Sequence, residues 1–298
     1  MLTPFTELNE VDYGALGAMV EWYIEQGVDG LFAVCQSSEM YHLTLQERVQ
    51  IARFVKQKAG HHVPVVASGH ISDGMQEQIS ELKAMVDTGI DALVWVSNHL
   101  ATQDDNDDIW KINAEKLMKA VPDIALGIYE CPTPYKRLVS PEILKWCAGT
   151  GRFLFLKDTC CNIEQLKAKN EAVLGSNLKI FNANSATLLD SLKMGMAGFS
   201  GVMANFHPAL YVWLTRNWEK EPEKAAIIQN FLGLASYIEG QYYPVNGKYH
   251  MQLDGIPIKL VTRSKDTEGF TSLHRLQVRQ LYDLTEEIVI KLFKEKVQ

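Results

Sequence analysis

The sequence has no long hydrophobic run and no strongly basic segment. No apolar run approaches the roughly 20 residues that a membrane-spanning helix needs, and the first residues, MLTPFTELNE, lack the basic and apolar regions of a signal peptide. The 298 residues carry a formal net charge of -7, with both signs mixed along the chain. Since phosphates are bound by clustered Lys and Arg, nucleic acid is not expected as a partner. These absences predict a cytoplasmic protein that binds neither membrane nor nucleic acid.

Cysteine is sparse, and the usual metal and cofactor motifs are missing. The five cysteines are an odd number without regular spacing, and adjacent Cys160 and Cys161 are poor partners for each other, which indicates reduced thiols. The segment DDNDDIWKINAE resembles a calcium loop, but Ile109 stands where the loop needs glycine, so we interpret it as an acidic helix start. No Walker loop or dinucleotide-binding glycine motif occurs. These segments therefore predict neither a calcium loop nor a nucleotide-binding loop.

Short apolar runs recur along the first two thirds of the chain. They are often β-branched and have Gly or Pro near their ends, as buried parallel strands do. The predicted strands are residues 28–34, 63–68, 91–97, 124–130, 153–157, 178–184 and 198–204. The segment LTPF, residues 2–5, could be the end of an eighth strand, although it is short and Pro4 interrupts it.

The segments between these runs have the apolar spacing of amphipathic helices. Helix start signals agree with this spacing: Thr44 and Glu47 form a capping box, and Ser140 precedes a first-turn proline. Beyond residue 207 the strand pattern ends. The helices predicted there are residues 207–218, 222–239 and 271–295, with residues 241–257 as a loop.

The alternation of strands and helices indicates an α/β fold. Eight βα units in about 220 residues favour a (β/α)8 TIM barrel over an open sheet, although the count depends on the weak first strand. We predict that residues 1–220 form this barrel and carry the active site. Residues 221–298 are predicted to form a C-terminal helical extension.

The predicted fifth strand ends on Lys157, a residue type that is rarely buried unless its charge is compensated. In a TIM barrel the carboxyl ends of the strands hold the active site. Because side chains alternate along a strand, Phe153, Phe155 and Lys157 are expected on one face. Gly127 on the preceding strand would leave room for the phenylalanines, and Tyr129 is expected at the height of Lys157.

A lysine and a tyrosine so placed suggest a specific chemistry. A lysine in an apolar pocket has a depressed pKa, because desolvation disfavours its charged form. The neutral amine can attack a keto carbon, and the resulting iminium accepts electrons while a C–C bond breaks or forms. A nearby phenol can move the protons. In the competing interpretation, Lys157 is solvated or forms an ion pair with Asp158. Tyr129 is then an amphipathic residue that lines the wall of the pocket and takes no part in catalysis.

Several segments resemble, in the same order, motifs of the dihydrodipicolinate synthase / N-acetylneuraminate lyase family of class I, Schiff-base aldolases. FLFLKDTCCN resembles the segment of the Schiff-base lysine, and GIYECP resembles the Tyr-Asn-x-Pro segment. FAVCQSSEMYHLTLQER resembles the Gly-Thr-Thr-Gly-Glu segment and the helix start after it. GFSGVMAN resembles the glycine-rich eighth strand, and GIPIKLVTR resembles the C-terminal helix. The resemblance covers nearly the whole chain.

This resemblance implies a pyruvate-type mechanism without metal or cofactor. Lys157 would form the imine with a 2-oxo acid, Tyr129 would shuttle protons, and Ser37 would hold the carboxylate. Further help would come from Ser38 and from the backbone near Ser200 and Gly201. For both serines, a helix-capping or turn role is the competing interpretation. The family is usually tetrameric or dimeric, which implies a homo-oligomer, with a homotetramer expected.

The chain departs from the family pattern on the substrate side. The segment CQSSE replaces both glycines and the first threonine. The Thr-Pro-Tyr-Tyr segment that supplies a relay tyrosine in the synthases reads SNHLA here, residues 97–101. The synthase arginine that binds a second carboxylate is missing, since Lys136 and Arg137 are out of register. Gln36 and His99 are expected to reshape the pocket for a polar, hydroxylated substrate, although His99 could be an ordinary polar loop residue.

These observations predict a Schiff-base lyase that cleaves or forms a 2-oxo acid with pyruvate as the common fragment. The expected substrate is a 2-keto-3-deoxy sugar acid or a sialic-acid-like compound. A second candidate is 4-hydroxy-tetrahydrodipicolinate (dihydrodipicolinate) synthase, which the missing arginine and tyrosine disfavour. A dehydratase of a keto-deoxy sugar acid and a non-catalytic relative that binds an oxo acid as a sensor also stay open.

Overall fold

The computed structural model describes residues 1–294, which group into two compact units. The first unit comprises Met1 and residues 29–201, and the second comprises residues 2–28 with residues from 202 onward. Compactness alone does not define where an independently folding domain ends, so the predicted division at residue 220 stays a prediction. No helix in the described part of the chain is long and apolar enough to cross a bilayer.

The first unit is built on a seven-stranded sheet whose strands follow one another in chain order. All neighbouring strands are parallel. The strands are β1 (Leu31–Phe32), β2 (Val65–Ala67), β3 (Ala92–Val96), β4 (Ala125–Tyr129), β5 (Phe153–Asp158), β6 (Lys179–Asn182) and β7 (Gly198–Phe199). Each one lies inside or next to a predicted run, so the predicted α/β class is confirmed.

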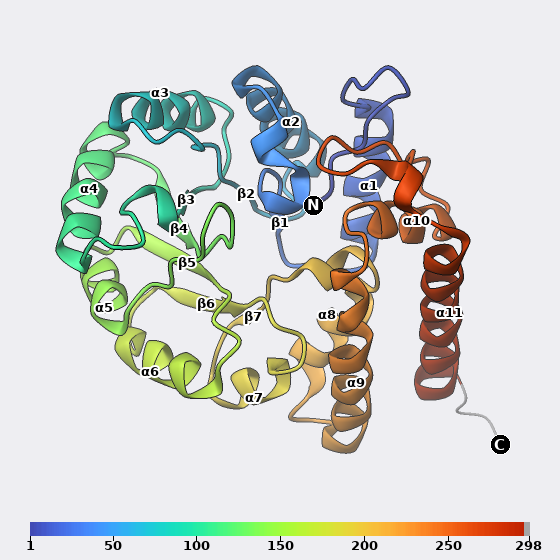
Figure 1. Cartoon of the computed structure of the whole chain (residues 1–298). Coiled ribbons are helices and arrows are strands. Elements are labelled where there is room, and N and C mark those ends of the chain that lie inside the picture. Colours follow the sequence, from blue (N-terminus) through green and yellow to red (C-terminus); the bar gives the residue numbers. More distant parts are fainter. Residues whose placement is uncertain (295–298) are drawn as a thin grey trace. The chain divides into compact units, whose positions relative to one another are not determined.

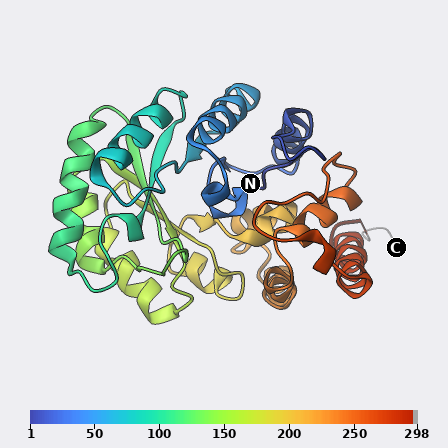
Figure 2. The same cartoon turned by 45° about the horizontal axis from the view of Figure 1, so that its top comes forward.

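Helices cover the outer face of this curled sheet (Figure 1), and a second view gives the same arrangement (Figure 2). They are α2 (Leu45–Ala59), α3 (Met75–Val86), α4 (Asp107–Ala120), α5 (Pro141–Gly149), α6 (Ile163–Val173) and α7 (Leu188–Lys193). Their predicted start signals are confirmed. The Thr44 hydroxyl accepts from the amide of Glu47 at 3.2 Å, and the Ser140 hydroxyl accepts from the amide of Ile143 at 3.1 Å. The acidic segment starts α4, with Asn106 as its N-cap.

The pairing of β4 with β5 contains a β-bulge that corrects one prediction. Leu126 pairs with Phe153, but Gly127 pairs with Phe155, so Leu154 is the extra residue. A bulge interrupts the alternation of side chains. Phe153 consequently packs on Trp146 of α5, with ring centroids 6.4 Å apart, and does not share the face of Phe155. The prediction that Phe153, Phe155 and Lys157 lie on one face is therefore wrong for Phe153.

The second unit contains helices and connecting segments. Its helices are α1 (Tyr13–Glu25), α8 (Pro208–Asn217), α9 (Pro222–Ala235), α10 (Val245–Leu253) and α11 (Ser272–Val289). The three helices predicted beyond residue 207 are confirmed, with α9 followed by the 3-10 turn Ser236–Gly240 and α11 by the π turn Ile290–Lys294. Residue 295, the predicted end of the last helix, and residues 296–298 of the predicted extension lie outside the described residues.

Three other expectations about this unit are wrong. The segment LTPF adds no strand to the sheet within residues 1–294, because Phe5 instead makes an isolated antiparallel bridge to Val11. The predicted loop 241–257 contains α10, whose Val245 and Met251 are fully buried. GIPIKLVTR, likened to a C-terminal helix, is not helical, since Gly255 adopts a left-handed φ of 82° and ends the helical path after α10.

Candidate functional site

Lys157 and Tyr129 lie side by side at the carboxyl ends of β5 and β4. They are direct register partners, as the alternation predicted. The Lys157 Nζ lies 4.7 Å from the centroid of the Tyr129 ring and 5.7 Å from that of Phe32. Only 7% of Lys157 and 4% of Tyr129 is exposed. The first unit thus places a buried amine against a phenol.

Aromatic rings line the space beneath the amine. Phe155 points to the same side as Lys157 and packs on Phe32 and Phe181, with ring centroids 6.0 and 5.1 Å apart. A Cβ atom at Gly127 would lie 3.0 Å from the Phe155 ring, so only glycine lets this ring fit without displacement. The room that the sequence predicted at Gly127 is therefore used by Phe155. These rings shield the stem of Lys157 from water.

Gln36 binds the phenol of Tyr129. Its side-chain oxygen accepts from the Tyr129 hydroxyl at 3.3 Å and from the Cys131 thiol at 3.6 Å. Its amide nitrogen donates to the Thr133 hydroxyl at 2.8 Å. Burial raises the pKa of Tyr129 well above its usual value, with the nearby Cys131 as a further cause. The phenol therefore keeps its proton and donates it toward Gln36.

Tyr41 is a polar residue of this region that sequence reasoning missed. Its hydroxyl donates to the backbone oxygen of Thr133 at 2.7 Å and lies 3.3 Å from Nε2 of His99. The His99 Nδ1 lies 3.8 Å from a carboxylate oxygen of Asp73. Burial raises the pKa of Tyr41 and lowers that of His99. The structure therefore brings His99 into a polar group with Tyr41 rather than into a solvated loop.

The two predicted carboxylate-binding serines differ in their environment. The Ser38 hydroxyl is fully buried, lies 2.9 Å from the backbone oxygen of Ala33 and accepts from the amide of Cys35 at 3.0 Å. This is a turn role rather than a ligand-binding one. The Ser37 hydroxyl has no hydrogen-bond partner within residues 1–294, and 8% of the residue is exposed. Of the two, Ser37 is the one whose hydroxyl is open to a ligand.

Ser200 and Gly201 follow β7 directly. The Ser200 amide donates to the backbone oxygen of Asn182 at 2.8 Å, so the sheet already uses it. A Cβ atom at Gly201 would lie 2.5 Å from the backbone oxygen of Ala183 and 2.2 Å from the Phe199 ring, so no side chain fits there. The glycine is explained by this packing, and ligand binding by these two residues stays a prediction.

The carboxylate of Asp158 has its own partners. It lies 2.5 Å from the Lys169 Nζ, and it accepts from the amide of Cys160 at 2.9 Å. The cation that pairs with Asp158 is thus Lys169, although the sequence allowed Lys157 in this role.

Within residues 1–294, no group of three or more His, Cys, Asp or Glu side chains is placed to hold a metal ion.

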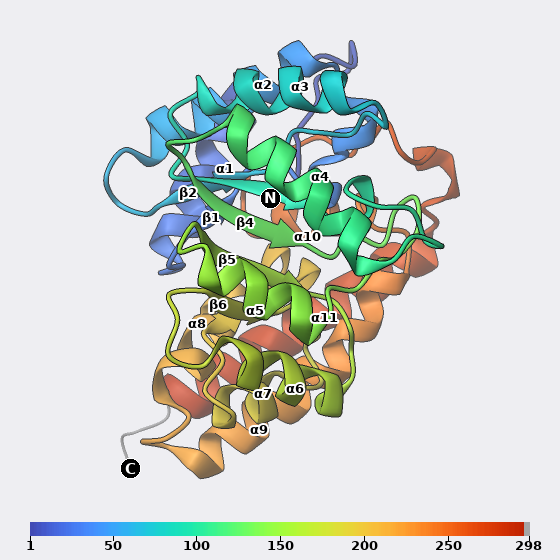
Figure 3. The same cartoon turned by 90° about the vertical axis from the view of Figure 1, so that its left-hand side faces the viewer.

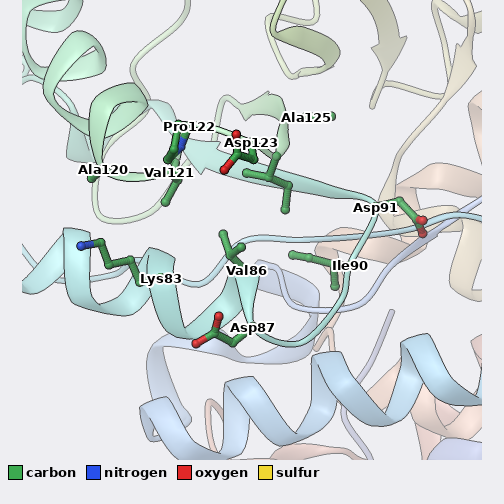
Figure 4. Close-up of a pocket in the computed structure, with 11 residues that line it drawn as sticks. Lys83, Val86, Asp87, Ile90, Asp91, Ala120, Val121, Pro122, Asp123 and Ala125 are labelled. Carbon is green, nitrogen blue, oxygen red and sulfur yellow. The ribbon is translucent and has the colours of Figure 1, made fainter.

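A cavity of about 530 Å³ lies at the opposite edge of the sheet (Figure 4). It is found at the amino ends of β3 and β4, between the last turns of α3 and α4. Its polar lining residues are Lys83, Asp87, Asp91 and Asp123. None of the predicted site residues lines it. In parallel α/β sheets ligands bind beyond the carboxyl ends of the strands, so we assign the candidate site to the edge that carries Lys157.

Residues 1–277 match the model of the Dihydrodipicolinate synthetase family. The chain belongs to this family. A relative from Acetivibrio thermocellus, named 4-hydroxy-tetrahydrodipicolinate synthase, is 24% identical over 265 residues, which are 87% of this chain and 86% of the relative. A relative of the same name from Coxiella burnetii is 27% identical over 213 residues, which are 71% of this chain and 70% of the relative.

The fold of the family is also found among solved structures. A prophage protein of the dihydrodipicolinic acid synthase family from E. coli K12, solved in complex with pyruvate, has a TM-score of 0.83 at 22% identity and covers 96% of each chain. The family resemblance drawn from the motifs is confirmed. Members of the family are class I, pyruvate-dependent Schiff-base lyases, so the prediction of an enzyme is confirmed at the family level.

Proposed function

We propose that the protein is a Schiff-base lyase in which Lys157 forms an imine with the keto group of a 2-oxo acid. The observation that carries this proposal is the buried amine of Lys157, whose Nζ lies 4.7 Å from the ring centroid of Tyr129 on the neighbouring strand. The amine attacks the keto carbon, and loss of water gives the iminium. The iminium then accepts the electron pair of the C–C bond that breaks, which releases an aldehyde and leaves an enamine of pyruvate. Protonation of the enamine carbon and hydrolysis of the resulting imine release pyruvate and restore the amine of Lys157.

Tyr129 is proposed to carry the protons of this reaction. It donates one to the leaving hydroxyl of the carbinolamine and takes one from the substrate hydroxyl when the C–C bond breaks. Gln36 supports it by fixing the direction of the phenol. The Ser37 hydroxyl is proposed to bind the carboxylate of the 2-oxo acid.

The substrate is proposed to be a 2-keto-3-deoxy sugar acid or a sialic-acid-like compound. The synthases need a cation for a second carboxylate. Here the Lys136 amine donates to the backbone oxygen of Thr159 at 2.8 Å, and the Arg137 guanidinium pairs with Asp107 at 3.3 Å. Gln36, Tyr41 and His99 offer uncharged polar groups, which suit hydroxyls. The synthase therefore stays the second candidate, favoured by the names of the relatives alone.

The seven-stranded sheet is proposed to be part of a (β/α)8 barrel, whose eighth strand the segment LTPF does not supply within residues 1–294. The uninterrupted strand order and the TM-score of 0.83 to a solved family member support this proposal. A homo-oligomer, a tetramer or dimer, and a cytoplasmic location stay predictions. The same holds for a dehydratase activity and for a role as a non-catalytic sensor.

Borohydride reduction in the presence of pyruvate tests the proposed imine. We expect a covalent adduct that peptide mass spectrometry places on Lys157 and that Lys157→Met abolishes. Lys179→Met is the matched control, because Lys179 lies exposed at the start of the neighbouring strand β6. An unmodified wild-type protein would favour the sensor. A panel of 2-keto-3-deoxy acids screened for pyruvate release then identifies the substrate, and complementation of a diaminopimelate auxotroph would indicate the synthase instead.

A further inference from the structure

Three charged side chains are buried together beside the candidate site. The Nζ of Lys169, on α6, lies 2.5 Å from Oε1 of Glu130 and 2.5 Å from Oδ2 of Asp158. Their exposed fractions are 3%, 0% and 0%. Removing an ion from water costs several kcal/mol of free energy, and the attraction within a well-formed buried ion pair offsets roughly this amount. A buried ion cluster is therefore a weak explanation of stability, and its position suggests another role.

The cluster lies directly behind the amine and the phenol. Glu130 follows Tyr129, and Asp158 follows Lys157. Neighbouring residues of a strand point to opposite faces. The two carboxylates therefore point toward α6, while the amine and the phenol point to the inner face. In Figure 3, α5 and α6 lie together on the near side of the sheet, below the strand β4. Lys169 thus joins the ends of β4 and β5 from outside.

The carboxylates also fix the loops that follow the two strands. Glu130 accepts from the amide of Val139 at 2.7 Å and from the amide of Thr159 at 2.9 Å. Asp158 accepts from the amide of Cys160 at 2.9 Å. Both loops are consequently tied to the same pair of carboxylates, which Lys169 holds together.

The cluster carries one more negative than positive charge when all three groups are ionised. Burial and the charge of Asp158 raise the pKa of Glu130 to about 7, although Lys169 opposes the shift. Burial lowers the pKa of Lys169, but the two carboxylates outweigh it and raise the pKa overall. Lys169 is therefore the cation that keeps two buried carboxylates from repelling each other.

We propose that Lys169 is a positioning residue for imine formation, which holds the strand ends that carry Lys157 and Tyr129 in register. This inference rests on the proposed function. A misplacement of about 1 Å at a reacting group can cost on the order of 100-fold in rate. Without Lys169 the two carboxyl groups lose the ammonium that links them, and Glu130, whose pKa is already raised to about 7, either repels Asp158 or takes up a proton. In both cases the strand ends behind the amine and the phenol are no longer tied together.

The test compares three variants by two measurements. Lys169→Met leaves two buried carboxylates. The double variant Lys169→Met/Glu130→Gln returns the buried net charge to that of the wild type but still lacks the ammonium. Lys167→Met is the matched control, because Lys167 is exposed on the same helix. We measure the urea midpoint of unfolding and the rate of borohydride-trapped adduct formation as a function of pyruvate concentration.

We expect Lys169→Met to lower both the urea midpoint and the trapping rate. At saturating pyruvate the rate falls on the order of 100-fold, while the half-saturating concentration changes little. The double variant recovers part of the midpoint, because Asp158 still lacks its cation, but does not recover the rate, and Lys167→Met changes neither. If Lys169→Met does not fold, the trapping rate and the urea midpoint of the double variant are sufficient to test the inference.

Two results would overturn the inference: a wild-type trapping rate in Lys169→Met, or a rate in the double variant that recovers together with its midpoint. The second result would mean that the cluster serves folding only. Absence of any adduct in the wild type is a different outcome, because it overturns the proposed function itself and the role of Lys169 with it.

Discussion

Replacing Tyr129 by phenylalanine removes one oxygen from the candidate site and keeps the ring beside Lys157. The hydroxyl donates to Gln36 over 3.3 Å, which is long for a hydrogen bond, and the Cys131 thiol donates to the same oxygen at 3.6 Å. Since this acceptor keeps a donor, the loss in the free energy of unfolding is expected at the low end for a hydrogen bond, about 0.5 kcal/mol. Proton transfer by a positioned side chain contributes about 100- to 10,000-fold in rate, which is about 3–5 kcal/mol of the barrier.

Tyr129→Phe should therefore lower the catalytic rate strongly and the free energy of unfolding only slightly. We expect kcat for pyruvate release to fall by roughly 100-fold or more, while urea unfolding reports a loss under about 1 kcal/mol. Tyr41→Phe is the matched control, because it removes a half-buried phenol that donates to the Thr133 backbone. Its kcat should fall less than about tenfold, since its proposed contact is with substrate hydroxyls. A Tyr129→Phe enzyme that keeps its kcat within about threefold would refute the assigned role.

Three further substitutions test the packing. Gly127→Ala places a Cβ 3.0 Å from the Phe155 ring, so we expect a loss of about 1–3 kcal/mol in urea unfolding; an unchanged midpoint would contradict this close packing. Leu154→Lys should cost less than about 0.5 kcal/mol, because the bulge leaves Leu154 40% exposed; a large loss would argue for regular alternation. Burial lowers the pKa of His207 to about 3 in the folded protein, while in the unfolded chain it is about 6.5. Between these two values only the unfolded chain takes up the proton, so the free energy of unfolding falls by about 1.4 kcal/mol per pH unit as the pH drops from about 6.5 toward 3. His207→Phe removes two ring nitrogens that lack partners in the described part of the chain, and urea unfolding at several pH values should show a shallower decline in acid; an equally steep decline would exclude His207 as a cause.

The pairing of Lys157 with Tyr129 could be predicted because it depends on two simple regularities. Apolar runs with Gly or Pro at their ends indicated the strands, and alternation placed both residues at the same height on adjacent strands. Phe153 could not be placed correctly in the same way. A bulge adds a residue to one strand only, and whether it forms depends on the packing of Phe155 and Trp146 around it rather than on the local pattern.

Other parts of the structure lacked a usable sequence signal. The helix α10 buries polar as well as apolar side chains, with Asn246, Lys248 and His250 each at most 2% exposed. Because polar side chains are buried together with apolar ones, the helix has no clear apolar stripe, so the periodicity that indicates a surface helix is missing. Tyr41 lies in a short 3-10 turn entered through Glu39, whose φ is 61°. Such a turn has no periodicity, and the contact of Tyr41 with His99 depends on the fold as a whole.

The dipeptides Tyr129-Glu130 and Lys157-Asp158 show how one regularity serves two purposes. In each, the first side chain points to the inner face and the second points to the helices, because strand neighbours alternate. The carboxylates that hold the strand ends therefore lie one residue away from the reacting groups and on the opposite face. Moving either carboxylate by a single position would bring a negative charge beside the amine and favour its unreactive ammonium form. The order of the two residues in each dipeptide is thus a requirement of the proposed chemistry, and exchanging Lys157 with Asp158 should abolish the borohydride-trapped adduct even if the protein still folds.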